Sequence, residues 1–159
     1  MNAGNDPAAW QNFYIMIGTA NAAITGLLFV ALSLHVKQIL AHPVYKPRAI
    51  VVLVILTTQI VISAIVLAPQ PRELMGWEIL ILNAFFLALN VRHRTPARLT
   101  AGSALTIAIR VIYVLASISL ITGVGGGFYI LGGVLTLTLV RSIFNCWTLL
   151  TALESDTAA

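Results

Sequence analysis

The sequence predicts an all-α integral membrane protein built as a bundle of five transmembrane helices. Of its 159 residues, 59% are hydrophobic and only 9% are charged, and the mean hydropathy is +0.96. Soluble proteins carry about 25% charged residues, so a soluble chain of this length could not cover its surface. The apolar residues also fall into runs close to the ~20 residues that a helix needs to cross the hydrocarbon core. We therefore expect one transmembrane domain over residues 1–159.

The expected spans follow from these apolar runs and from the residues that interrupt them. Pro47 suits the first turn of the second span, and the Pro69-Gln70-Pro71 segment ends it. The third apolar run contains Glu78, so a four-span alternative places this run at the membrane interface. Its ILILNAFFLALNV core favours a span instead. In chain order, the five spans cover about residues 10–40, 47–68, 72–91, 96–122 and 128–153.

Positive charges in short loops predict the orientation, because such loops stay on the cytoplasmic side. The first and third loops hold most of the basic residues, namely Lys37, Lys46, Arg48, Arg92, Arg94 and Arg98. The opposite side has Arg72 beside Glu73. The amino terminus is thus expected outside and the carboxyl terminus in the cytoplasm. Basic residues arranged in this way orient a membrane protein, and they do not indicate a nucleic-acid partner.

Five polar side chains are expected at a similar depth, near the middle of the five spans. Arg110 and Arg141 lie deep inside apolar stretches, where an arginine costs about 2.5 to 3.5 kcal/mol on insertion scales and marks a functional site by default. By helix rise, Asn21, Gln59 and Asn83 reach the middle of the first three spans. Each such group needs a partner or water in that environment, which favours one shared polar layer.

Two helices extend this layer into polar stripes, whose members recur at alternating spacings of three and four and therefore share one helix face. The fourth span carries Ser103, Thr106, Arg110, Tyr113 and Ser117, and the fifth carries Thr138, Arg141, Asn145 and Thr148. One interpretation is a water-accessible lining. The other is a dry helix interface held by Ser, Thr and Asn hydrogen bonds.

The sign of the buried charge favours an anion as the ligand. Glu78 lies near the outer end of the third span, so it cannot neutralise two arginines at the centre. A helical bundle with excess positive charge near the middle of the membrane favours anions over cations. We expect a homo-oligomeric channel or small transporter whose path is lined by the polar layer and its two stripes. The alternative is a non-conducting subunit or assembly factor that docks another membrane protein or lipid through this layer.

Enzymatic chemistry, metal binding and a cofactor are not expected. The chain has no Ser-His-Asp set or paired membrane carboxylates. His35 has no second histidine at comparable depth and no Cys or carboxylate cluster beside it, which argues against a metal site. A quinone or haem held by the arginines is a weaker option.

Three further patterns indicate packing and topology. Gly18, Ala22 and Gly26 recur every four residues, as in helices that approach closely. The glycine-rich segment at 122–129 differs in order from a potassium-channel filter and suits an outer hairpin, where glycine allows positive φ. Aromatic residues typical of an interfacial belt gather at the expected outer boundary: Trp10, Phe13, Tyr14, Trp77, Phe128 and Tyr129.

The segment FYIMIGTANAAITGLLFVALSLH, from Phe13 to His35, resembles a group of uncharacterised small bacterial polytopic membrane proteins. The resemblance extends more loosely to the APQP break after the second span. It implies a bacterial inner-membrane protein. It carries over no catalytic or binding residues.

Overall fold

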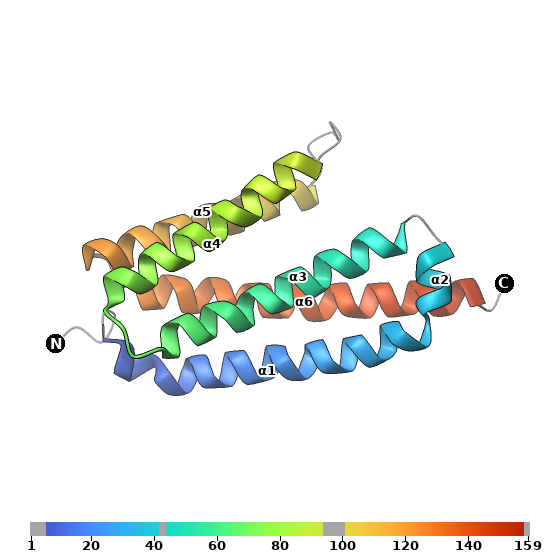
Figure 1. Cartoon of the computed structure of the whole chain (residues 1–159), viewed down its shortest axis with the longest axis horizontal. Coiled ribbons are helices and arrows are strands. Elements are labelled where there is room, and N and C mark those ends of the chain that lie inside the picture. Colours follow the sequence, from blue (N-terminus) through green and yellow to red (C-terminus); the bar gives the residue numbers. More distant parts are fainter. Residues whose placement is uncertain (1–5, 42–43, 94–100, 158–159) are drawn as a thin grey trace. The chain divides into compact units, whose positions relative to one another are not determined.

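The computed structural model describes residues 6–41, 44–93 and 101–157, without the side chains of residues 38, 89–93, 101–103 and 154–157. Within these ranges 92% of the residues are helical and none lies in a strand, which confirms the all-α prediction. Arg94 and Arg98 lie outside the described residues, as do the side chains of Arg92 and Ser103. The helices are α1 (Pro7–Leu34), α2 (Val36–Ala41), α3 (Tyr45–Leu67), α4 (Arg72–His93), α5 (Ala101–Thr122) and α6 (Gly127–Thr157) (Figure 1).

Four of the described helical segments are long and apolar enough to cross a membrane. These segments are Pro7–Leu34, Tyr45–Leu67, Ala104–Thr122 and Gly127–Leu153. Large apolar side chains project outward along them, and Leu27, for example, is 74% exposed. Such exposure is unfavourable in water and favourable in lipid. The chain is therefore a multi-pass membrane protein.

The chain divides into two compact units. The first comprises residues up to Tyr14 together with Ala64–Val134, and the second comprises Ile15–Ser63 together with Leu135–Ala159. Helices α4 and α5 belong to the first unit and α2 to the second. Helices α1, α3 and α6 contribute residues to both.

The first expected span is interrupted in the structure. Helix α1 ends at Leu34, and α2 begins at Val36 and takes a new direction (Figure 1). At the break, the His35 Nδ1 atom lies 3.0 Å from the Ala31 carbonyl oxygen. That carbonyl is the acceptor that a continuing helix would use for the His35 backbone N–H, and competition of this kind weakens a helix locally. The pattern of apolar residues alone did not predict the break.

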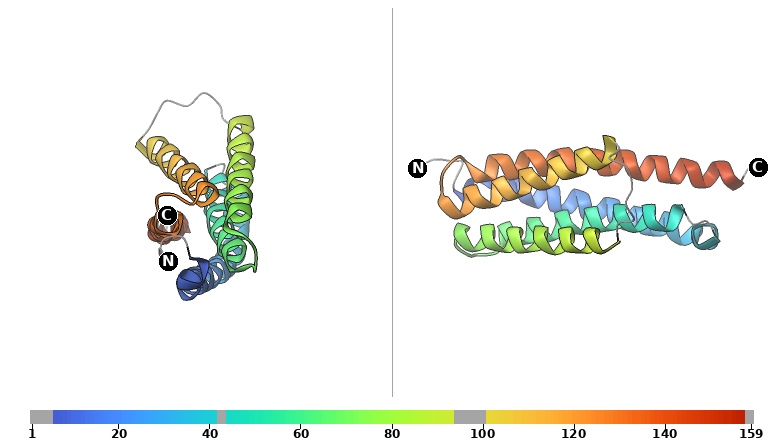
Figure 2. Two further views of the ribbon diagram at one scale, coloured as in Figure 1. Left: turned by 90° about the vertical axis from the view of Figure 1, so that its left-hand side faces the viewer. Right: turned by 90° about the horizontal axis from the view of Figure 1, so that it is seen from above.

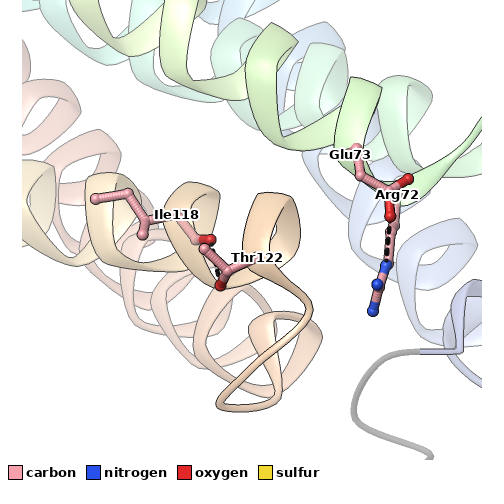
Figure 3. A network of polar contacts seen from close by, with 4 residues as sticks. All are labelled: Arg72, Glu73, Ile118 and Thr122. Carbon is pink, nitrogen blue, oxygen red and sulfur yellow. Dashed lines mark hydrogen bonds and ion pairs between the residues drawn. The ribbon is translucent and has the colours of Figure 1, made fainter.

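In the first unit, α4 and α5 pack against each other as an antiparallel pair (Figure 2). Gly76 permits their close approach, since a Cβ at this position would lie 2.8 Å from the Ser117 carbonyl oxygen. The turn after α5 contains three glycines with positive φ, Gly123, Gly125 and Gly126, as expected for a glycine hairpin. Arg72 lies over Gly123 and its Nε atom donates to Glu73 (Figure 3).

Aromatic side chains from the starts of α1 and α6 form a second contact within the first unit. The rings of Trp10 and Tyr129 meet edge to face with centroids 4.7 Å apart. Tyr14 and Phe128 are fully buried, and the Tyr14 hydroxyl donates to the Phe128 carbonyl at 3.4 Å. The predicted aromatic belt therefore has an inward-packed part, whereas Tyr129 remains exposed.

The second unit contains two apolar clusters. One joins Ile39 and Tyr45 to the last turns of α6 at Leu149 and Leu153. The Tyr45 hydroxyl also donates to the Ala152 carbonyl at 3.3 Å. The other cluster joins Leu28, Val52, Leu56 and Cys146, and so brings together α1, α3 and α6.

Candidate functional site

Arg110 of α5 and Asn83 of α4 form a reciprocal pair in the first unit. The Arg110 Nη1 atom donates to the Asn83 side-chain oxygen at 2.9 Å and to the Asn83 backbone carbonyl at 3.3 Å. In return, Asn83 Nδ2 donates to the Arg110 backbone carbonyl at 3.2 Å. Two of the five residues expected at mid-membrane are thus in direct contact.

The ligands that Asn83 offers to Arg110 are neutral. An arginine stays protonated in proteins, so two neutral oxygens stabilise its charge through charge-assisted hydrogen bonds without cancelling it. Both side chains are half-buried. Between them they hold the guanidinium in a fixed position on the antiparallel helix pair, which is the kind of preorganised donor that an anion site requires.

The rest of the α5 stripe lies partly in the core of the first unit. Tyr113 and Ser117 are buried, whereas Thr106 is half-buried. The Ser117 hydroxyl donates to the Tyr113 carbonyl, one turn earlier in the same helix, at 2.8 Å. A hydroxyl satisfied in this way needs no water and no second helix.

Asn21 of α1 and Gln59 of α3 form the corresponding contact in the second unit. Asn21 Nδ2 donates to the Ile17 carbonyl at 2.8 Å and to Gln59 Oε1 at 3.4 Å. The two side chains are 0% and 1% exposed. This pair is neutral and enclosed, and its interhelical bond is long.

Ser63 is a third buried polar residue of the second unit, and it was not among the predicted site residues. It follows Gln59 by one turn on α3 and is 1% exposed. Gly18 of α1 packs against it, since a Cβ at position 18 would lie 3.1 Å from the Ser63 Cβ atom. The spacing of four from Gln59 was the available signal in the sequence, since it places both residues on one face of the helix.

Three polar atoms of this cluster have no hydrogen-bond partner among the described residues. They are Asn21 Oδ1, Gln59 Nε2 and Ser63 Oγ. Buried polar atoms are almost always paired with protein or with ordered water. An enclosed group of three is therefore a candidate binding site.

The α6 stripe, in the second unit, is mixed in character. The buried Thr138 hydroxyl donates to the Leu135 carbonyl at 3.0 Å. Ser142, adjacent to Arg141, donates in turn to the Thr138 carbonyl at 2.8 Å. Arg141 and Asn145 are both half-buried. The exposed Thr148 hydroxyl donates to the Asn145 carbonyl at 3.1 Å.

The structure thus brings the predicted residues together as two separate pairs. Asn83 and Arg110 belong to the first unit, and Asn21 and Gln59 belong to the second. Arg141 lies in the second unit as well. One common layer across all five expected spans remains a prediction.

Glu78, the carboxylate expected nearest the polar layer, is hydrogen-bonded to Gln70. Glu78 Oε2 accepts a hydrogen bond from Gln70 Nε2 at 2.8 Å, and the same amide donates to the Ile65 carbonyl at 3.1 Å. Gln70 therefore ties the end of α3 to α4 across the proline-containing break. Within the described part of the chain, no group of three His, Cys, Asp or Glu residues could hold a metal ion.

Comparison of the chain with models of protein families, with curated proteins and with solved structures finds no match.

Proposed function

We propose that this chain is a homo-oligomeric membrane channel or small transporter for anions, with Arg110 and Arg141 lining the path. The observation that carries the proposal is the fixed guanidinium of Arg110, held by two neutral oxygens of Asn83 and still partly exposed. A fixed cation on an apolar helix pair attracts an anion strongly, because the local dielectric constant is low. The ligand class is therefore a small inorganic or organic anion such as chloride.

The path is proposed to lie between copies of the chain, because a few short helices enclose little volume. Exposed small residues on α1 support close contacts between copies. Ala22 and Gly26 are exposed, and a Cβ at position 26 would have no neighbour within 4 Å. Small residues of this kind let transmembrane helices pack closely.

We further propose a bacterial inner-membrane protein with five spans, the amino terminus outside and the carboxyl terminus in the cytoplasm. Helix α4 supplies the fifth span, since its 22 residues would extend ~33 Å at the usual helix rise. Exposed Lys37, Lys46 and Arg48 at the first connection support a cytoplasmic location for that loop. Reporters fused to each terminus test this topology: an odd number of spans places the termini on opposite sides, and termini on one side would exclude it.

Anion flux from liposomes tests the proposed activity. Purified protein is reconstituted and chloride efflux is compared between wild type, Arg110→Gln and Arg72→Gln. The Arg72 variant is the matched control, because it removes the same charge from an exposed ion pair at the start of α4. We expect Arg110→Gln to lose about tenfold or more of the flux, as for loss of one charged hydrogen-bond donor, and Arg72→Gln to retain it. Equal flux in all three proteins, or none in any, would refute the proposal.

A second candidate function is a non-conducting subunit or assembly factor that docks another membrane protein or lipid. It is favoured by the buried hydroxyls of Ser117 and Ser142, which bond within their own helices as in a dry interior. This function predicts a stable hetero-complex on purification in mild detergent. Recovery of a symmetric homo-oligomer alone would count against it.

A further inference from the structure

The cluster of Asn21, Gln59 and Ser63 in the second unit combines burial with incomplete hydrogen bonding. The three side chains are 0%, 1% and 1% exposed. Each has one polar atom without a partner among the described residues, namely Asn21 Oδ1, Gln59 Nε2 and Ser63 Oγ. We infer that these atoms form a buried binding site for one or two water molecules. This inference does not depend on the proposed anion path.

The Ile17 carbonyl determines how the Asn21 and Gln59 amides are oriented, and therefore which of their atoms lack a partner among the described residues. Asn21 Nδ2 donates to the Ile17 carbonyl at 2.8 Å, so turning this amide over would place two oxygens against each other. With Nδ2 fixed, Gln59 must present its oxygen to Asn21, because the reverse orientation would oppose two donors. Hydrogen-bond geometry thus sets both amide orientations. The remaining acceptor on Asn21 and the remaining donor on Gln59 are a consequence of this geometry.

The mixture of donor and acceptor selects a neutral ligand. An anion would be repelled by the Asn21 oxygen, and a cation would be repelled by the Gln59 amide hydrogens. Ser63 offers a hydroxyl that can donate or accept. A molecule that both donates and accepts satisfies all three atoms, and water does so with the two to four polar partners that buried water normally has.

Burial limits the size of the ligand. The three side chains are almost completely shielded from solvent, and α1 approaches α3 closely where Gly18 meets Ser63. A partner protein or a lipid head group could not reach these atoms from outside. Water is a hydrogen-bonding molecule small enough for such a site. Immobilising a water molecule costs less free energy than leaving these polar groups unpaired in an apolar interior.

Solid-state NMR of the full-length protein in lipid bilayers tests the site directly. Side-chain amides are labelled with ¹⁵N, the Gln59 signal is assigned by its loss in Gln59→Leu, and magnetisation transfer from water is measured. We expect transfer to the Asn21 and Gln59 amides at rates well above those of buried backbone amides such as that of Leu56. Transfer at the backbone level would overturn the inference. A shift of either signal on adding sodium or chloride would also overturn it, because the ligand would then be an ion.

Thermal unfolding of two serine variants provides an independent readout. Ser63→Ala removes a hydroxyl that bonds the water, and we expect its Tm to fall by about 2–4 °C. Ser117→Ala is the matched control, because Ser117 is equally buried and its hydroxyl donates to the Tyr113 carbonyl one turn back in its own helix; its Tm should change little. A Ser63→Ala protein as stable as wild type, or more stable, would show that the Ser63 hydroxyl binds no water molecule.

Discussion

Two pairs of polar residues lie within apolar helices, and they differ in how they are hydrogen-bonded. The charged pair is Asn83–Arg110 in the first unit, and the neutral pair is Asn21–Gln59 in the second. The charged pair makes three hydrogen bonds, two of them to backbone carbonyls. The neutral pair is joined by an interhelical bond of 3.4 Å, and two of its atoms have no partner in the part of the chain that the structure describes. The pair that contains the charge is half-buried, and the neutral pair is enclosed.

This difference follows the energetics of the groups. An arginine is far more expensive to desolvate than an amide, so it requires both more hydrogen bonds and some access to the surface. An amide pair can be enclosed if a small molecule completes its bonding. The charged pair is therefore suited to a ligand that arrives from outside, and the neutral pair is suited to one that stays within the fold.

The largest expected effect comes from breaking the charged pair. Asn83→Leu removes the side-chain oxygen that accepts from Arg110 Nη1 at 2.9 Å and puts an apolar side chain against the guanidinium. We expect the free energy of unfolding to fall by about 1.5–3 kcal/mol, the range for hydrogen bonds to charged groups. Denaturant unfolding in detergent micelles, followed by circular dichroism, measures this change.

Asn83→Asp is the companion variant, because it keeps the acceptor and adds a negative charge. The variant loses the Nδ2 donor to the Arg110 carbonyl, but the stronger charge-assisted bond to the guanidinium offsets that loss, so stability should be retained. The anion flux should fall, since the carboxylate neutralises Arg110. A stable Asn83→Leu protein would mean that the pair contributes little. Undiminished flux in Asn83→Asp would mean that the charge of Arg110 is not what the anion senses.

A smaller effect is expected from the neutral pair, and the size of the loss depends on whether one or both partners are removed. Asn21→Leu and Gln59→Leu should each lower the free energy of unfolding by about 1–2 kcal/mol, because each leaves the other amide less satisfied. The double variant should recover most of this loss. Unfolding of all four proteins in a double-mutant cycle measures the coupling; strictly additive losses would contradict direct contact between the two residues.

The sequence predicted the helical segments and the polar positions better than it predicted their partners. Apolar runs placed the end of α3 within one residue of Leu67 and the end of α5 at Thr122. Helix length and hydropathy are properties of the local chain, so they can be read without the fold. Asn83 and Arg110 were recognised for the same reason, because a polar group deep in an apolar run is conspicuous.

The contacts that complete each pair depend on how neighbouring helices approach, which no local pattern determines. Ser63 was missed because a serine among aliphatic residues is common in membrane helices, and only the approach of Gly18 gives it significance. Gly76 was missed similarly, since its importance comes from the Ser117 carbonyl on another helix. The break at His35 depends on a side-chain contact with Ala31, and the apolar pattern continues through it.

The smallest expected effect concerns the exposed ion pair at the start of α4, where Arg72 Nε lies 2.9 Å from Glu73 Oε1 (Figure 3). Water solvates both partners, and salt screens them, so exposed pairs of this kind contribute little. Arg72→Gln should therefore lower stability less than either amide variant, and the difference from wild type should disappear when unfolding is repeated at high salt. A loss as large as that of Asn83→Leu, or one that persists at high salt, would indicate that Arg72 acts through its packing over Gly123. The contrast between a well-bonded interior charge and a solvated surface charge would then no longer explain the stability of the first unit.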